Sequence, residues 1–116
     1  VLISGDHALL EEMLTNLLEN GIKYNHAGGY VRARAEMADG RAVVTVADNG
    51  VGIAPEDQQR VFERFYRVDK GRSRDMGGTG LGLAIVKHAA TYHGADIRLD
   101  STVGKGTTIT VTFPKQ

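Results

Sequence analysis

The feature that most constrains this chain is a glycine-rich turn that runs directly into an apolar helix. Within residues 77–83, Gly78, Gly80 and Gly82 alternate with other residues, and an apolar helical run begins at Leu81. Glycine lets the backbone turn sharply and lets another group approach closely, and the start of a helix presents unpaired N–H groups at the positive end of its dipole. These features together predict a binding site for phosphate oxygens, although an ordinary glycine-rich turn into a helix fits the same residues.

Two common phosphate-binding loops fit this chain poorly. A dinucleotide-binding loop follows a strand and requires a third glycine where this chain has Leu83, and the residues before the turn are typical of a loop. A Walker loop requires Ser or Thr after its Gly-Lys pair, but Gly104-Lys105 is followed by Gly106. The remainder of a nucleotide site must therefore come from other parts of the chain.

The composition is that of one ordinary globular domain. Its 116 residues are enough to bury a core, and a formal net charge of +0 argues against a general nucleic-acid-binding protein. The absence of cysteine excludes disulfides and thiolate chemistry, and no apolar run approaches the length of a membrane span. Because the chain opens on Val1 inside an expected strand, we expect it to be a piece of a longer protein.

Periodicity and turn residues predict a mixed helix and strand pattern. In chain order we expect a strand over 1–3, a helix capped by Asp6 and ended by Gly28-Gly29, a strand over 30–37, a hairpin turn at Asp39-Gly40, a strand over 41–47, a helix over 55–65, a helix over 81–93, and strands around 97–99 and over 107–113. Helical spacing predicts one buried stripe on the first helix, formed by Leu10, Met13, Leu14, Leu17 and Leu18. Alternation in the strand over 30–37 predicts one buried face, formed by Val31, Ala33, Ala35 and Met37.

Two polar groups stand out against this pattern. Asn16 and Asn20 lie one turn apart at the edge of the buried stripe, with Lys23 nearly in line. Since asparagine is not favoured in helix interiors, the pair suggests a polar wall facing a cavity, or else two amides bonded to neighbouring backbone. Asp48 closes a core strand and is followed by the spaced glycines Gly50 and Gly52. Its carboxylate suits an exocyclic amine and the glycines a flat ring, although a simple Asx turn fits as well.

In the middle of the chain we expect a hydrophobic segment followed by a mobile loop. Aromatic residues over 62–66 interleave with Arg64 and Arg67, which we interpret as a hydrophobic anchor. Residues 69–77 carry small and charged side chains before Met76 and are expected to move when no ligand is bound. The four histidines show no spacing typical of a metal site and are interpreted as surface or packing residues.

Five segments, taken in order, resemble the motifs of the catalytic domain of bacterial sensor histidine kinases. They are residues 16–24 (N box), 48–53 (G1 box), 62–67 (F box), 78–83 (G2 box) and 104–108 (the closing turn). These segments span nearly the whole chain, and the ordered set is far more specific than any single motif. The resemblance extends to the superfamily that also contains DNA gyrase, the MutL proteins and a heat-shock chaperone.

The resemblance implies a fold and an activity. The fold would be α+β, a two-layer α/β sandwich (Bergerat fold) with a mixed, mostly antiparallel sheet of about five strands packed against three helices, and with a flexible ATP lid at about 69–77. Residues 1–116 would form one catalytic domain that binds ATP and Mg²⁺. That domain would supply the γ-phosphoryl group to a histidine on a separate dimerisation domain.

The resemblance also implies roles for single residues. Asp48 would bond the adenine amine, with Gly50, Gly52, Ile53 and Thr107 nearby and Tyr24 beside the base or ribose. Asn20 would coordinate Mg²⁺ with Asn16 in support, Lys23 would contact a phosphate, and Arg64 or Arg67 would approach the terminal phosphate. The phosphates would lie against the backbone of Gly78, Thr79, Gly80, Leu81, Gly82 and Leu83.

One position bears on the reaction. Hydrolytic relatives carry a glutamate one turn before the magnesium-binding asparagine, where this chain has Asn16, an amide that cannot act as a general base. We place Glu12 and Glu19 on other parts of the helix and therefore expect weak ATP hydrolysis. Gly21 stands where the family usually has alanine, which could loosen the helix by up to about 1 kcal/mol.

The partners follow from what the chain lacks. No histidine here lies in the phosphoacceptor motif of the family, so we expect the acceptor on a dimerisation domain of the parent kinase and, beyond it, a response regulator. The isolated domain is expected to be a monomer in the cytoplasm, with the parent anchored in the inner membrane. The alternative is a nucleotide-binding regulatory module, either a serine kinase of the anti-sigma type or a domain that senses ATP without transfer.

Overall fold

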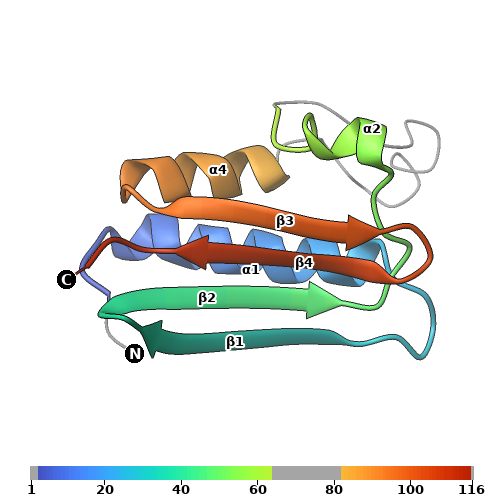
Figure 1. The fold of residues 1–116 in the computed structure, drawn as a ribbon, viewed down its shortest axis with the longest axis horizontal. Coiled ribbons are helices and arrows are strands. Elements are labelled where there is room, and N and C mark those ends of the chain that lie inside the picture. The colour runs from blue at the N-terminus through green and yellow to red at the C-terminus, as the bar shows by residue number, and fades with distance from the viewer. Residues whose placement is uncertain (1–2, 64–81, 116) are drawn as a thin grey trace.

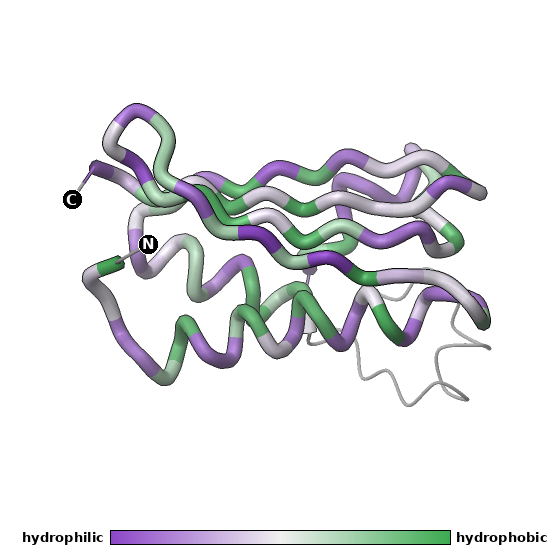
Figure 2. The backbone as a smooth tube through the Cα atoms, turned by 90° about the horizontal axis from the view of Figure 1, so that it is seen from below, coloured by the Kyte–Doolittle hydropathy of each residue, from purple (hydrophilic) through white to green (hydrophobic). Residues whose placement is uncertain are grey.

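A single antiparallel sheet with helices on one face organises the chain (Figure 1). The computed structural model describes residues 3–63 and 82–115. The elements are α1 (His7–Lys23), β1 (Val31–Ala38), β2 (Arg41–Asp48), α2 (Pro55–Gln58), α4 (Gly82–Tyr92), β3 (Asp96–Thr102) and β4 (Gly106–Thr112). The strands lie in the order β1-β2-β4-β3, and Figure 2 shows the sheet and the helices as two layers.

The predicted two-layer α+β sandwich is confirmed, with differences in the sheet. Its described part has four strands rather than about five, and every pairing in it is antiparallel rather than mixed. Of the expected strand over 1–3 the structure describes Ile3. This residue lies outside the sheet and packs against the core.

Local signals set the first helix and the first hairpin. The Asp6 carboxylate accepts a hydrogen bond from the Leu9 amide at 3.0 Å, which confirms the predicted N-cap. Asp39 and Gly40 both have positive φ, at 54° and 76°, as the predicted tight turn requires. The helix ends at Lys23, however, so the expected glycine stop is wrong and residues 25–29 form the connection to β1 instead.

The core lies between the sheet and the paired helices α1 and α4. Its largest fully buried side chains are Phe113, Met13, Leu17, Val86 and Val111. Neighbouring strands contribute alternate residues to this layer, since residues two apart point to the same face of a sheet. The predicted helix stripe is correct at its centre but not at its edge, because Leu14 is 38% exposed.

The predicted burial of one face of β1 is correct only at its first residue. Val31 is half-buried and packs against the core, whereas Ala33 and Ala35 are exposed and Met37 retains 49% of its accessible surface. β1 is an edge strand, and in Figure 1 α1 lies behind the middle of the sheet and α4 lies beyond β3, away from β1. Alternation identified the apolar side correctly, but the helix layer is too narrow to cover it beyond Val31.

The helix expected over 55–65 is also shorter than predicted. After Gln58 the Asp57 carbonyl still accepts from Val61 four residues on, but it also accepts from Arg60, and the amide of Glu63 bonds to the Arg60 carbonyl. These two three-residue steps interrupt the α-helical pattern, and turns follow the helix. Within the two described stretches, no helix has the length and apolar content needed to cross a membrane.

Candidate functional site

The carboxylate of Asp48 is held at the end of β2 by two backbone amides. Its Oδ1 accepts hydrogen bonds from Gly50 N at 2.9 Å and from Thr107 N at 3.3 Å. Its Oδ2 makes no hydrogen bond to any described residue and lies on the side of Gly21, where an added Cβ would stand 3.5 Å away. The aspartate therefore has one oxygen fixed by the fold and one available to a donor.

Thr107 lies directly across from Asp48 and is the buried polar residue of the described core. The two residues are paired in the β2–β4 register, and Thr107 is only 7% exposed. Its Oγ1 lies 2.8 Å from Ser101 Oγ. The structure thus brings together two of the residues that the resemblance assigned to the base.

Ser101 is a residue that the sequence analysis missed. It stands opposite Thr107 in the β3–β4 register, and its Oγ also accepts from Ile53 N at 2.7 Å. The signal was present in the alternation of β3, because Ile97 and Leu99 face the core and Ser101 is the next residue on that face.

The two glycines after Asp48 allow the backbone to pack against itself. A Cβ on Gly50 would collide with the Tyr24 carbonyl, and the neighbouring Val51 amide donates to that carbonyl at 3.0 Å. Gly52 has φ +77°, and a Cβ there would collide with the Thr102 carbonyl. In the described structure these glycines permit a close approach of the chain's own backbone; the approach of a flat ring stays a prediction.

A polar joint ties the end of α1 to the loop after β2. Asn49 Oδ1 accepts from the Tyr30 amide at 2.6 Å, and Asn25 Nδ2 donates to the Tyr30 carbonyl at 2.9 Å. His26 Nε2 donates to the Asn49 carbonyl at 2.9 Å. Tyr24 lies at this joint, where its carbonyl accepts from the Val51 amide of the loop after Asp48.

The candidate phosphate-binding residues of α1 lie along one side of the helix. Asn20 is half-buried, and its side chain makes no hydrogen bond within the described residues. Asn16 Nδ2 instead donates to the Glu12 carbonyl one turn earlier, at 2.8 Å. Lys23 is exposed in the last turn. Among residues 3–63 and 82–115, Asn20 is therefore the amide of this pair whose side chain uses none of its hydrogen-bonding groups.

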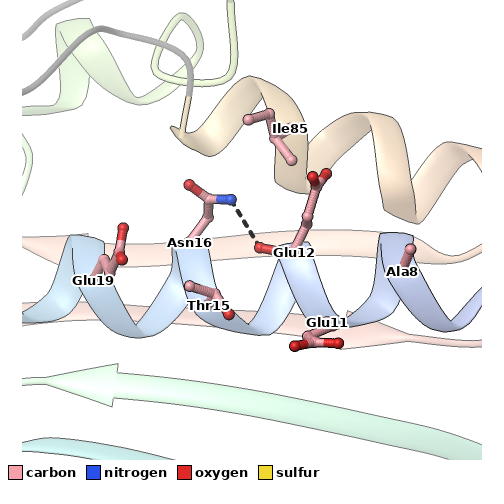
Figure 3. A pocket seen from close by; sticks show the side chains of 7 residues that line it. All are labelled: Ala8, Glu11, Glu12, Thr15, Asn16, Glu19 and Ile85. Carbon is pink, nitrogen blue, oxygen red and sulfur yellow. Dashed lines mark hydrogen bonds between the residues drawn. The ribbon is translucent and has the colours of Figure 1, made fainter.

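A hollow of about 340 Å³ lies beside Asn16, between α1 and α4 (Figure 3). Its lining is formed by Ala8, Glu11, Glu12, Thr15, Asn16, Glu19 and Ile85. Figure 3 shows Asn16 and Glu12 directed from α1 toward α4. The placement of Glu12 and Glu19 on other parts of the helix is therefore wrong, because both line the same hollow as Asn16.

The start of α4 reaches α1 at this hollow. A Cβ on Gly82 would stand 3.3 Å from Asn16 Oδ1, so two predicted site residues from distant segments are neighbours. Leu83 packs against the core at the same end of the helix. Asp48 does not line the hollow. The described site residues therefore form two groups along α1, one around Asp48 near Gly21 and one around Asn16 near the start of α4.

The remaining predicted site residues lie outside the described part of the chain. They are Arg64, Arg67, Gly78, Thr79, Gly80 and Leu81, together with the proposed lid over 69–77. Among the described residues no group of three or more His, Cys, Asp or Glu side chains could hold a metal ion. A metal at this site would therefore depend on ligands such as an amide, water and the oxygens of a bound molecule.

Comparison with known proteins decides the family. Residues 5–116 match the family described as "Histidine kinase-, DNA gyrase B-, and HSP90-like ATPase". The chain belongs to this family. The match takes in both ends of the site, from α1 through Asp48 and α4 to Thr107.

The similar relatives are sensor histidine kinases. The sensor-like histidine kinase SenX3 of Mycolicibacterium smegmatis is 50% identical over 113 residues, which cover 97% of this chain and 29% of SenX3. The sensor histidine kinase WalK of Bacillus subtilis is 46% identical over 111 residues, covering 94% of this chain and 18% of WalK. The chain thus spans less than a third of the length of the relatives it matches.

Solved structures agree with this assignment. The mycobacterial sensor histidine kinase MprB superposes with a TM-score of 0.86 at 38% identity, over 97% of this chain and 76% of that one. ShkA, solved at full length in complex with AMPPNP, superposes with a TM-score of 0.79 at 33% identity, over 95% of this chain and 22% of ShkA. The predicted resemblance to the catalytic domains of sensor histidine kinases is confirmed.

Proposed function

We propose that this chain binds Mg-ATP and supplies the γ-phosphoryl group to a histidine on a separate dimerisation domain of its parent kinase. The observation that carries the proposal is the Asp48 carboxylate, whose Oδ1 is fixed by two amides, one of them that of the buried Thr107, while Oδ2 stays available on the side of Gly21. A related kinase, ShkA, has been solved with AMPPNP, which supports an adenine nucleotide as the ligand.

The base end of the site suits an exocyclic amine. An ionised carboxylate is a strong acceptor for N–H groups, and Asp48 has an oxygen to spare. Ile53 is buried and would offer apolar surface to a ring, while Gly50 lets the loop approach the end of α1 and Gly52 lets it approach Thr102. We assign adenine to this end of the site, with Tyr24 beside the base or ribose.

The phosphate end would lie along α1 toward α4. Asn20 would hold Mg²⁺, an ion that prefers few protein ligands and keeps water and phosphate oxygens around it. When bound, the ion would neutralise phosphate charge. Asn16 would support Asn20, Lys23 would contact a phosphate, and Gly82 with Leu83 would close the site from α4.

Residues outside the described part complete this assignment. Arg64 or Arg67 would approach the terminal phosphate. The backbone from Gly78 through Thr79, Gly80 and Leu81 would lie along the phosphates, beneath the lid over 69–77. Positioning and charge neutralisation account for most of the catalysis in phosphoryl transfer.

Slow ATP hydrolysis is expected because α1 has no well-placed general base. The Asn16 amide cannot remove a proton from water. Glu12 is a possible base in the same hollow, but it stands eight residues before Asn20, or roughly 12 Å along the helix axis. We therefore assign the chain to transfer rather than hydrolysis, and a turnover comparable to that of dedicated ATPases would contradict this assignment.

The parent protein supplies the acceptor and the setting. We propose that the domain acts as a monomer on the cytoplasmic side of an inner-membrane kinase, and that a response regulator receives the phosphoryl group in turn. SenX3 and WalK, each several times longer than this chain, are consistent with such further domains.

The deciding experiment combines this chain, the separately produced dimerisation domain of its parent, and ATP labelled at the γ-phosphate. We expect label on the dimerisation domain that acid removes and base does not, as for phosphohistidine. A dimerisation domain whose acceptor histidine is replaced by glutamine is the matched control. ATP binding without any transfer would favour the alternative, a nucleotide-binding regulatory module.

A further inference from the structure

We propose that Ser101 determines the base specificity of this site by fixing the hydroxyl proton of Thr107. The inference rests on the proposed function, because it concerns the nucleotide that would lie beside Asp48. Ser101 acts through Thr107 and is therefore a positioning residue. The preferred base is one that carries an amino group, as adenine does, rather than a keto oxygen.

The Ser101 hydroxyl has three hydrogen-bonding neighbours and one proton. This hydroxyl lies 3.0 Å from the Gly106 carbonyl, 2.7 Å from the Ile53 amide and 2.8 Å from Thr107 Oγ1. A carbonyl can only accept and an amide can only donate. The single proton of Ser101 must therefore go to the Gly106 carbonyl, and its lone pairs remain for Ile53 and Thr107.

The direction of the hydrogen bond between Ser101 and Thr107 follows from this. Because the Ser101 proton is used on Gly106, the contact between the two hydroxyls requires Thr107 to be the donor. Thr107 Oγ1 then has only lone pairs left to offer any further partner. Its deep burial and its place in the sheet keep it from turning to water for a different arrangement.

Two acceptors consequently face the same end of the site. The available oxygen of Asp48 is one, and Thr107 Oγ1, directly across the β2–β4 pair, is the other. An amino group has two N–H bonds and suits two acceptors, either directly or through one water. A keto oxygen at the same ring position would bring a third set of lone pairs against them. The hydrogen that such a base carries on N1 lies at the neighbouring ring position, so acceptors directed at the amino position are left without a donor.

The test compares ATP with ITP, its analogue in which a keto group replaces the amino group. Affinities are measured by calorimetry with Mg²⁺ present. We expect Ser101→Ala to reduce the preference for ATP over ITP by about tenfold, because the released Thr107 hydroxyl can then donate to the keto oxygen, and one hydrogen bond corresponds to about that factor. A purely structural role of Ser101 would weaken both nucleotides equally and would overturn the proposal.

Thr107→Val provides an independent measurement if Ser101→Ala does not fold. Removing the hydroxyl removes one acceptor, so the preference for ATP should fall by a similar factor, and adding Ser101→Ala to Thr107→Val should change it no further. Thr108→Val is the matched control, since Thr108 neighbours Thr107 on β4 and points to the opposite face. An unchanged preference in Thr107→Val would overturn the proposal, whereas a wild-type protein that binds no ATP would instead overturn the proposed function.

Discussion

Asp48→Asn tests the base end of the site with a change of one atom. Oδ1 of Asp48 accepts from two backbone amides, of Gly50 and Thr107. In the variant the remaining oxygen must stay in that place, because an NH₂ group there would face two donors. The new NH₂ group therefore takes the position of Oδ2 and faces the base.

The expected loss follows from the strength of one charge-assisted hydrogen bond. Such bonds contribute about 1.5–3 kcal/mol, so the ATP dissociation constant should rise by about 10- to 150-fold. ITP should lose much less, because the new NH₂ group can donate to its keto oxygen. The free energy of unfolding should change by less than about 1 kcal/mol, since both amides keep their acceptor.

Calorimetry with both nucleotides, and chemical denaturation followed by circular dichroism, give the required measurements. Asp39→Asn is the matched control: it makes the same chemical change in the hairpin turn at the other end of β2, where φ is 54° and asparagine is equally suited. The reasoning would be refuted if Asp48→Asn bound ATP within twofold of the wild type, or if ATP and ITP weakened equally.

Four further substitutions test other parts of the structure. Asn20→Ala should weaken Mg-ATP binding by at least about tenfold. Removing Mg²⁺ with EDTA should then lower the ATP affinity of this variant much less than that of the wild type, and an equal effect of EDTA on both proteins would contradict the assignment. Leu17→Ala should destabilise the fold by about 2–5 kcal/mol, whereas Leu14→Ala, at a site 38% exposed, should cost less than half as much by denaturation. Gly52→Ala should lower the free energy of unfolding by at least about 1 kcal/mol, because its φ is +77° and its Cβ would collide with the Thr102 carbonyl; an unchanged stability would disprove the need for glycine there.

The parts of the fold that sequence predicts well are those that short-range signals determine. Asp6 caps α1 through an amide three residues away, and the Asp39-Gly40 pair turns the hairpin through its own backbone angles. Both features can be recognised from neighbouring residues alone, although the Asp6 amide also donates to His93 Nε2 in the folded chain. The buried centre of the α1 stripe, Met13 and Leu17, is likewise a matter of helical spacing.

One error concerns the width of the helix layer. Alternation in β1 gives the side of the sheet on which Met37 lies, but not whether a helix reaches that side, because that depends on distances between segments which a single sequence does not contain. The misplacement of Glu12 has a different cause: Glu12 stands four residues before Asn16, so helical spacing alone already puts both on one face of α1.

Ser101 shows the same limit at the site itself. Its position on the core face of β3 could be read from alternation, but its contacts with Ile53 and Thr107 depend on the strand register and on a loop 48 residues away. Asp48 could be recognised because its motif is local. A positioning residue is harder to predict than the residue it positions, since its partners come together only in the folded sheet.

The two ends of the site differ in how firmly the fold determines them. At the base end, backbone amides and Ser101 set the orientations of Asp48 and Thr107 before any ligand arrives. At the other end, Asn20 makes no hydrogen bond within the described residues and Lys23 is exposed, so the described part of the fold does not set the orientations of these side chains. Selectivity for the base should therefore be built into the folded sheet and should survive changes to the phosphate chain, whereas discrimination between ATP and ADP should depend on groups that are positioned only when the ligand is bound.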